Sequence, residues 1–349
     1  MKVLFLTPWY PSEKDAMLGL FVQKHVEAVR AQGVDVRVIF SRGWIDLCRQ
    51  WRALKREWGL PDVVQLNVIQ KQGLLALWLK KKYKIPYVIV EHFTGYLPEN
   101  KSVAESRWHI AFMKRICREA EVVMPVSEQL GKAMQSLGFQ AKRWEIIDNI
   151  VDDFFFDTAT KIDKKTNIKT LLNITCFDEP HKNVKGLLRA AKALSEKRQD
   201  WRLVLVGTGV DYREVRAYAD TLNIPAGLVV WTGELTPGEV AEWMHKSDAF
   251  VLSSRYETYG VVLAEAVAAG IPIVSTPVGI AEDVADIIVP QEIAQGDAKR
   301  FADYMETVLW NSELISKNNK KVSKDRFSTQ AVGKKLKAVY ASCMDYSAQ

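Results

Sequence analysis

The sequence lacks the features that mark membrane-spanning, secreted and disulfide-stabilised proteins. Its longest apolar runs fall far short of the roughly 18 residues that suggest a transmembrane helix. Only four apolar residues separate Lys2 from Thr7, too few for a signal-peptide core of roughly 7–15 residues. The four cysteines form no C-x-x-C pair, which argues against a disulfide framework or a zinc site. We therefore expect a cytoplasmic protein.

Several short catalytic motifs are also missing. The five histidines form no H-x-x-x-H pair, and the sequence has no D-x-D, no G-x-S-x-G and no Walker loop. These absences argue against a metal hydrolase, a manganese-dependent sugar transferase, a serine hydrolase of that type and a P-loop enzyme. Gly207-Thr-Gly209 lacks the third glycine of a dinucleotide fingerprint, because Tyr212 stands there. We expect no metal and no resident cofactor.

The chain is mildly basic, and the charge is unevenly distributed. The formal net charge is +6, and residues 1–160 hold 23 basic against 18 acidic residues. This excess is compatible with an anionic partner for the first half of the chain. No nucleic-acid motif of interleaved basic and aromatic residues is present, so we expect no nucleic-acid partner.

Short apolar runs alternate with helical patterns along the chain, and its 349 residues are enough for two domains. The alternation predicts parallel βαβ units, that is, an α/β protein with two Rossmann-like domains facing each other across a cleft. The polar, lysine-rich residues 157–170 are the predicted linker. The predicted strands are Lys2–Leu6, Val34–Phe40, Asp62–Val68, Pro86–Val90, Glu121–Val126, Lys169–Thr175, Arg202–Val206, Leu228–Trp231, Ala249–Leu252 and Pro272–Ser275.

The most informative segment is residues 249–274. It predicts a strand, a loop that holds Glu257, and a helix that begins near Gly260 and is almost entirely apolar. The amides of Val261 and Val262, in the first turn of that helix, are suited to bind an anion such as a diphosphate. Glu257 would then face the group attached to the phosphate.

Glu265 is the charged residue within that helix. A helix without a polar face is expected to be buried, which places the Glu265 carboxylate in the interior at a cost unless it is paired. Two interpretations stay open. One is a structural ion pair or hydrogen bond, and the other is a carboxylate that accepts hydrogen bonds from ligand hydroxyls such as those of a ribose.

Glu257 and Glu265 form an E-x7-E pattern within E-T-Y-G-V-V-L-A-E-A, which resembles the signature of glycosyltransferase family 4, retaining enzymes of the GT-B fold. The resemblance extends over nearly the whole chain. Its further motifs are Pro8-Trp-Tyr-Pro11 with Gly19-Leu-Phe-Val22, Glu91-His92, Val123-Met-Pro-Val-Ser127, Ile147-Asp-Asn149-Ile-Val-Asp152, Lys182-Asn-Val-Lys185-Gly186, Val206-Gly207-Thr-Gly209 and Trp231-Thr-Gly233.

The resemblance implies roles for both domains. Residues 1–160 would form the acceptor domain, to which a C-terminal helix at 330–349 crosses back, and residues 165–329 would bind the donor. Glu257 would orient the donor sugar, and His92 would contact that sugar from the opposite domain. Glu265 would hold the ribose hydroxyls. The other implied donor-binding residues are Gly19, Gly207, Gly260, Val261 and Val262.

A lysine is also implied beside the phosphate. The family usually has an arginine shortly before the lysine–glycine turn, which here is Lys182–Gly186 and is called the lysine turn below. In this chain the stretch before it is Cys176-Phe-Asp-Glu179. Lys182 or Lys185 is therefore left to carry the positive charge, with Lys182 as the catalytic candidate. The choice between the two stays open.

The implied function is metal-independent, retaining transfer of a sugar from a nucleotide diphosphate sugar to an acceptor hydroxyl. The acceptor would be a sugar or a lipid-linked sugar, in the assembly of a cell-surface polysaccharide or glycolipid. A sugar-nucleotide epimerase or a phosphorylase on the same fold is the alternative, and a non-catalytic nucleotide-sugar binder is a third class.

A predicted helix at residues 44–58 has apolar residues at three- and four-residue steps: Trp44, Leu47, Trp51, Leu54 and Trp58. Basic residues lie between them, a pattern typical of interfacial membrane binding. Most such stripes pack in a core, so core packing is the favoured interpretation. Peripheral contact with an anionic membrane, on its inner face, is the second hypothesis, and the cationic helix at residues 74–84 supports it.

Overall fold

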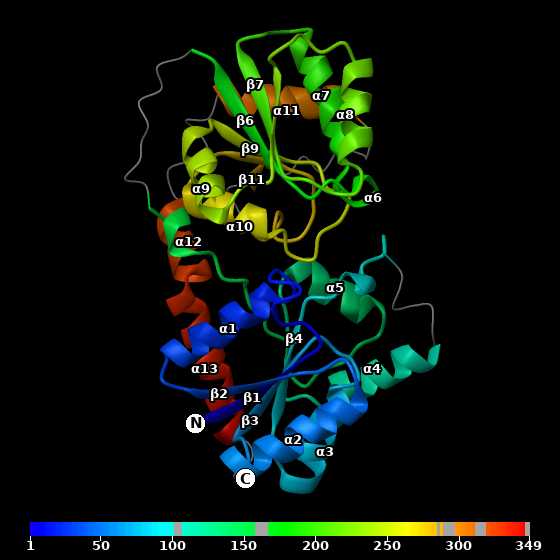
Figure 1. Ribbon diagram of the computed structural model, residues 1–349, viewed down its shortest axis with the longest axis vertical. Helices are drawn as coiled ribbons and strands as arrows, with labels where there is room; N and C mark the ends of the chain where they lie inside the picture. Colours follow the sequence, from blue (N-terminus) through cyan, green and yellow to red (C-terminus); the bar gives the residue numbers. More distant parts are fainter. Residues whose placement is uncertain (101–106, 158–166, 285–286, 289–296, 311–318, 346–349) are drawn as a thin grey trace. The chain divides into compact units, whose positions relative to one another are not determined.

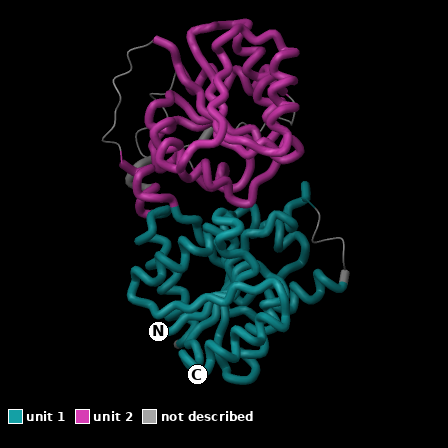
Figure 2. Tube along the Cα trace, viewed as in Figure 1, with its two compact units in different colours: residues 1–150, 326–349 teal, residues 151–325 magenta. Residues whose placement is uncertain are grey.

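The chain forms two compact α/β units (Figures 1 and 2). The computed structural model describes residues 1–100, 107–157, 167–284, 287–288, 297–310 and 319–345. Unit 1 comprises residues 1–150 and 326–349, and unit 2 comprises residues 151–325. Most of the predicted linker, residues 157–170, lies outside the described residues.

Unit 1 is built on a five-stranded parallel sheet in the order β2-β1-β3-β4-β5. The order reverses between β1 and β3, which makes the carboxyl ends of these strands a topological switch point. The strands are β1 (Lys2–Thr7), β2 (Asp35–Phe40), β3 (Val63–Asn67), β4 (Tyr87–Glu91) and β5 (Val122–Pro125). The helices and 3-10 turn are α1 (Leu20–Ala31), α2 (Trp44–Trp58), α3 (Gly73–Tyr83), η1 (Thr94–Tyr96), α4 (Arg107–Glu119), α5 (Glu128–Ser136) and α13 (Thr329–Asp345).

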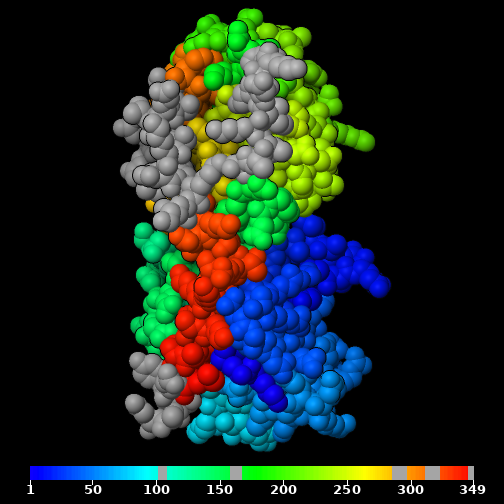
Figure 3. Space-filling model, turned by 90° about the vertical axis from the view of Figure 1, so that its left-hand side faces the viewer, coloured from blue at the N-terminus to red at the C-terminus, as the bar shows by residue number. Residues whose placement is uncertain are grey.

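The C-terminal helix α13 packs against α1, and Figure 3 shows the two segments side by side on the surface. Leu336 and Tyr340 of α13 are fully buried, and the Tyr340 hydroxyl donates a hydrogen bond to the side chain of Gln65 in β3. Helix α12 (Asn319–Phe327) leads into α13 and contains the boundary between the units. The last helix is therefore part of unit 1, although unit 2 precedes it in the chain.

Unit 2 is built on a parallel sheet in the order β11-β10-β9-β6-β7-β8. The strands are β6 (Lys169–Ile174), β7 (Trp201–Val206), β8 (Val229–Gly233), β9 (Ala249–Leu252), β10 (Ile273–Ser275) and β11 (Ile287–Ile288). The helices and 3-10 turn are η3 (Asp153–Phe155), α6 (Glu179–Lys182), α7 (Val184–Ser195), α8 (Tyr212–Thr221), α9 (Pro237–Lys246), α10 (Val261–Ala269) and α11 (Ala298–Trp310). The order reverses between β6 and β9, as expected of a doubly wound sheet.

The core of unit 2 explains why its strands are apolar. Leu203 and Leu205 of β7 alternate with Val204, and all three are buried. The two leucines join the core formed with α7 and α11, while Val204 points to the opposite face. A strand covered on both faces has no polar side, so its sequence is a short continuous apolar run. The predicted strands are confirmed in both units, with bounds that differ by at most two residues at either end.

Helix α2 buries most of its tryptophan stripe but exposes the residues at its start. Core packing is confirmed for Leu47, Trp51 and Trp58, which are buried. Trp44 and Ile45 at the start of the helix are 47% and 86% exposed. Among the described residues, none of the helices is both long and apolar enough to cross a membrane.

Candidate functional site

A cavity of about 280 Å³ opens at the switch point of the unit 2 sheet. Ile174 ends β6 and Leu252 ends β9, and both residues line the cavity. These two strands are neighbours in the sheet, but their following connections run in opposite directions. Ligands of open α/β sheets bind in the crevice that this divergence creates. The cavity therefore lies where a doubly wound unit is expected to bind a ligand.

An ion pair lies at the wall of this cavity. The Nζ atom of Lys182 donates a hydrogen bond to Oε1 of Glu257 at 2.6 Å, and the side chains are 14% and 11% exposed. The Ser254 hydroxyl donates to the same carboxylate oxygen at 2.8 Å. Lys182 ends the short helix α6, whereas Glu257 lies in the loop after β9. The pair therefore holds two loops together and fixes an ammonium group beside the cavity.

The start of helix α10 forms another part of the wall. Gly260 precedes the helix, and it lines the cavity together with Val261 and Val262. No side chain caps this helix start, and its first turn has no acidic residue. The first amides of a helix carry partial positive charge. Lys182 and the helix start thus bring two sources of positive charge to one cavity.

The expectation that Glu265 lies in the interior is wrong. Six residues of α10 are buried, but Glu265 is partly exposed, and Val261 one turn earlier is 39% exposed. Residues four positions apart share a face of a helix, so α10 has an open edge that its apolar composition conceals. This edge continues from the cavity wall at Val261 to the Glu265 carboxylate.

The structure brings Lys182, but not Lys185, to the cavity. The Lys185 Nζ atom donates a hydrogen bond to Oε1 of Glu214 at 2.5 Å and lies 5.5 Å from the ring centre of Tyr218. The hydrogen bond to Glu214 raises the pKa of Lys185. Its side chain thus contacts α8, on the other side of the lysine turn.

The lysine turn is fixed by an arginine that the sequence analysis missed. Arg255 donates hydrogen bonds to the carbonyl oxygen of Glu179 at 2.5 Å and to Oδ1 of Asn183 at 3.0 Å. Phe177, in the stretch that lacks the family's arginine, is fully buried and packs against Tyr212. Arg255 lies 72 positions from Asn183, and nothing in the local pattern signals this pairing.

Gly207 follows β7 and contacts the segment that leaves β6. A Cβ atom at this position would lie 2.0 Å from the carbonyl oxygen of Thr175, so only glycine fits. Thr175 and Cys176 line the cavity, whereas Gly207 is not among the residues that line it. Gly207 therefore supports the wall of the cavity from behind.

The remaining candidates lie in unit 1. Gly19 precedes α1 with φ +68°, and a Cβ atom there would lie 2.4 Å from the carbonyl oxygen of Trp9. His92 directly follows β4, and its ring packs on Phe21 with 4.0 Å between ring centres. The loop after β1 and the end of β4 are thus joined through the start of α1.

The Glu91 carboxylate shapes the backbone around His92. It is fully buried and accepts hydrogen bonds from the amides of Ile69, His92 and Phe93 and from the Tyr96 hydroxyl, at 2.9 to 3.0 Å. Burial raises the pKa of Glu91, although the four hydrogen bonds act against it. Glu91 fixes the turn from which His92 projects.

His92 has a histidine neighbour, His25, which the sequence analysis did not single out. Their ring centres are 6.0 Å apart, and both side chains are buried. Burial lowers the pKa of His25 to about 4, and burial together with the charge of His25 lowers the pKa of His92. Nε2 of His25 lies 3.2 Å from the Asp148 carbonyl oxygen. Both rings are therefore neutral at pH 7.

Comparison with known proteins extends over both units. The description Glycosyltransferase Family 4 matches residues 1–153, and Glycosyl transferases group 1 matches residues 159–325. The chain is 30% identical over 313 residues to the phosphatidyl-myo-inositol mannosyltransferase of Mycobacterium leprae, covering 87% of this chain and 78% of that protein. It is 22% identical over 245 residues to the alpha-monoglucosyldiacylglycerol synthase of Streptococcus pneumoniae, covering 64% of this chain and 55% of that protein.

A solved structure has the same fold. HepE from Anabaena, in complex with UDP and glucose, matches with a TM-score of 0.71 and 18% identity. The match covers 98% of this chain and 100% of that chain. At this identity the likeness concerns the fold, which is that of a GT-B protein with two parallel-sheet α/β units.

Proposed function

The chain belongs to the group 1 and family 4 glycosyltransferases, and on that premise we propose that it transfers a sugar from a nucleotide diphosphate sugar to an acceptor hydroxyl with retention of the anomeric configuration. The observation that carries the proposal is the cavity at the switch point of unit 2, with Lys182 beside the start of α10. The relatives named above are a transferase and a synthase, which favours transfer over the epimerase and phosphorylase alternatives.

The charges at this cavity suit the departure of a nucleoside diphosphate. As the bond to the sugar breaks, negative charge develops on the β-phosphate. Lys182 and the amides of Val261 and Val262, residues that line the cavity, would stabilise that charge without a metal. Glu257 would hold Lys182 in place and hydrogen-bond the donor sugar. Glu265, on the open edge of the same helix, would accept hydrogen bonds from the ribose hydroxyls.

Two assignments in unit 1 belong to the same proposal. His92 would contact the donor sugar as a neutral hydrogen-bonding group, since burial keeps its pKa well below 6.5. Gly19 would shape the loop after β1 into the ligand's binding surface. Both assignments come from the family resemblance, and variants tested for sugar transfer would check them.

The acceptor in our proposal is a sugar or a lipid-linked sugar. HepE was solved with UDP and glucose, and the two relatives are named for products or substrates built on lipids. A uridine nucleotide is therefore the first donor to test, and a glycolipid or cell-surface polysaccharide precursor the first acceptor.

Thermal unfolding with nucleoside diphosphates and their sugars, with and without EDTA, tests donor binding. A ligand at about a hundred times its Kd stabilises the protein by roughly 2.7 kcal/mol, which is visible as a rise in Tm. We expect a rise for one base only, unchanged by EDTA. No rise with any nucleotide would overturn the donor site, and a rise abolished by EDTA would overturn metal independence.

The lysine turn supplies a matched pair of variants. Lys182→Met should lower kcat by about 100-fold or more, because it removes a charge that stabilises the leaving group. Lys185→Met removes the same charge from the other side of the turn and should leave kcat nearly unchanged. Equal losses in the two variants would count against the role of Lys182.

We also propose that unit 1 contacts an anionic membrane. Trp44, Ile45, Trp78 and Trp108 are 47%, 86%, 40% and 89% exposed, and they lie on three basic helices. Helices α2 and α3 are joined by a hydrogen bond from Lys55 to the Tyr83 hydroxyl at 2.8 Å. Helix α3 also contacts α4.

Flotation with vesicles tests this contact. Wild type should float with anionic but not with zwitterionic vesicles, and the double variant Trp44→Ser, Ile45→Ser should remain at the bottom. Val210→Ser is the control, because Val210 is 88% exposed but lies in unit 2. Unchanged flotation of the double variant would refute the role of this helix end.

A further inference from the structure

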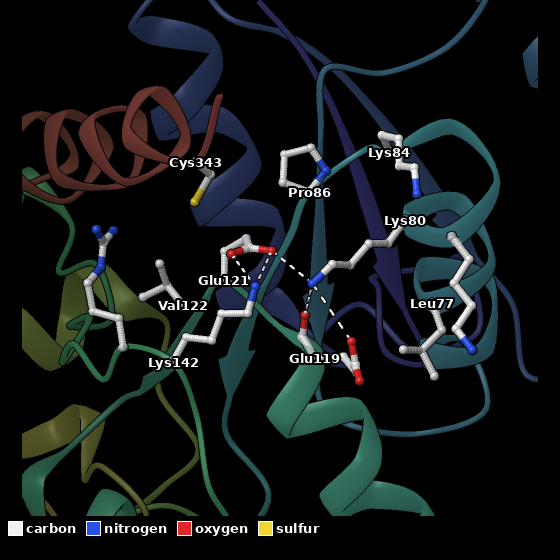
Figure 4. A pocket seen from close by; sticks show the side chains of 11 residues that line it. Leu77, Lys80, Lys84, Pro86, Glu119, Glu121, Val122, Lys142 and Cys343 are labelled. Carbon is white, nitrogen blue, oxygen red and sulfur yellow. Dashed lines mark hydrogen bonds and ion pairs between the residues drawn. The ribbon is translucent and has the colours of Figure 1, made fainter. Parts of the chain in front are cut away.

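A second and larger cavity, of about 840 Å³, lies in unit 1 (Figure 4). Pro86 precedes β4 and Val122 begins β5, and both residues line the cavity. These strands are parallel, so the cavity lies at the edge of the sheet opposite to Glu91 and His92. Four steps along β4 separate the two edges by about 13 Å. The cavity is therefore distinct from the candidate transfer site.

The charged residues that line this cavity are mostly cationic. The cations are Lys80, Lys81, Lys84, Lys142 and Arg143. The carboxylates are Glu119 and Glu121. They come from α3, from the end of α4 and from the segment after α5, so three separate parts of the chain converge on one cavity.

One of the carboxylates is fully engaged. Glu121 accepts hydrogen bonds from Lys142 at 2.8 and 2.9 Å and forms an ion pair with Lys80 at 2.8 Å (Figure 4). Burial would raise the pKa of Glu121, but these two lysines outweigh it and lower the pKa. Lys80 also donates a hydrogen bond to the Glu119 carbonyl oxygen. Glu121 thus anchors two of the cations at the centre of the cavity wall.

Two of the cations remain available. Within the described part of the chain, the ammonium groups of Lys81 and Lys84 have no partner, whereas Arg143 is bound to Glu145 and to the Ser342 hydroxyl. Lysines at the end of a helix are often explained by the helix dipole. That explanation covers Lys81, but it does not account for the cations that other segments bring to the same cavity.

We propose that this cavity binds a phosphate-bearing anion, either a free phosphate compound or the headgroup of an anionic lipid. Its volume is that of a small-molecule site. Lysine ammonium groups bind phosphate as point charges, and Leu77, Pro86 and Val122 offer apolar contact to the rest of the molecule. The site goes beyond the proposed sugar transfer, because it uses none of the residues assigned to the donor.

Isothermal titration with inorganic pyrophosphate and flotation with phosphatidic acid vesicles test the two sources of phosphate. The test variant is Lys81→Gln with Lys84→Gln. The control is Lys334→Gln with Lys335→Gln, which removes equal charge from exposed positions of α13 that do not line the cavity and do not belong to the proposed membrane contact. Each titration is repeated on Lys182→Met, because pyrophosphate also fits the proposed donor cavity.

We expect the test variant to weaken pyrophosphate binding about tenfold or more, since hydrogen bonds to charged groups contribute roughly 1.5–3 kcal/mol. The control and Lys182→Met should retain this binding event. If pyrophosphate does not bind but the test variant alone loses flotation, the lipid headgroup is the source. Equal losses in the test and control variants, or no binding to either probe, would overturn the proposal. UDP binding in the same samples reports separately on the donor site.

Discussion

Single residues decide whether the loops of this protein can take their shapes. Gly19 connects the loop after β1 to α1 at a positive φ and in contact with the backbone of Trp9. Lys182 and Lys185 are three positions apart, yet Lys182 contacts Glu257 and Lys185 contacts Glu214. At this scale a side chain's neighbours matter more than its chemical type.

Gly19→Ala should lower the free energy of unfolding by about 3 kcal/mol or more, because it combines a left-handed backbone with a steric clash. Gly33→Ala is the control. Gly33 has φ +75°, but a Cβ atom there has nothing within 4 Å, so the cost should be about 1 kcal/mol. Urea denaturation measures both values, and similar costs would show that the contact with Trp9 is unimportant.

The buried histidines make stability depend on pH. The folded protein does not protonate His25 until about pH 4, whereas the unfolded chain does so near 6.5. The unfolded state therefore binds more protons in this range, and the free energy of unfolding falls by about 3 kcal/mol as the pH drops through it. His25→Gln should show a smaller fall between pH 7.5 and pH 4.5 in urea denaturation. An identical fall in the variant would contradict this assignment.

At the scale of elements, α10 combines binding and packing. Its buried face packs against α9 and β10, its first turn lines the cavity, and its open edge carries Glu265. A nine-residue helix spans about 13 Å, enough to present a phosphate site and a ribose site in succession. In our proposal, the same element would contact two parts of one ligand.

The two glutamates of the E-x7-E pattern should therefore separate in function. Glu265→Gln should weaken UDP binding by about tenfold, because it removes a charged acceptor. Glu257→Gln should bind UDP nearly normally but lower kcat, because the donor sugar and Lys182 lose their shared carboxylate. Calorimetry and initial rates measure the two effects. If neither variant differed from wild type, the assignment of both residues would fail.

At the scale of the whole molecule, each unit is organised by a reversal of strand order. The reversal brings β6 next to β9 in unit 2 and β1 next to β3 in unit 1. The chain then returns to unit 1 through α13, whose buried side chains complete the packing against α1. Unit 1 therefore needs both ends of the chain.

Leu336→Ala tests whether the packing of α13 stabilises unit 1. Leu336 is fully buried in α13, so its truncation should cost about 2–5 kcal/mol, while Lys335→Ala on the exposed side should cost almost nothing. In hydrogen exchange, the amides of β1 and β3 should lose protection, and those of β6 and β7 should not. Equal loss of protection in both sheets would contradict the division into two units.

The sequence predicted the elements well and the burial of some side chains poorly. Every predicted strand is present, because a covered parallel strand must be a short apolar run. Burial of Glu265 was wrong, because the composition of α10 conceals which face meets solvent. The tryptophans of α2 share one spacing, yet Trp51 is buried and Trp44 is half exposed, because Trp44 is the first residue of the helix and burial begins only at Leu47.

The sequence by itself determined the class of each element, the apolar start of α10 and the family to which the chain is similar. These depend on neighbours two to four positions apart, which a linear pattern contains. Only the tertiary structure decided that Lys182 reaches Glu257 across 75 positions, that Arg255 fixes the lysine turn, and that cations from three segments meet at the far edge of the unit 1 sheet. Such contacts depend on which strands lie side by side, and packing of the whole unit determines that order.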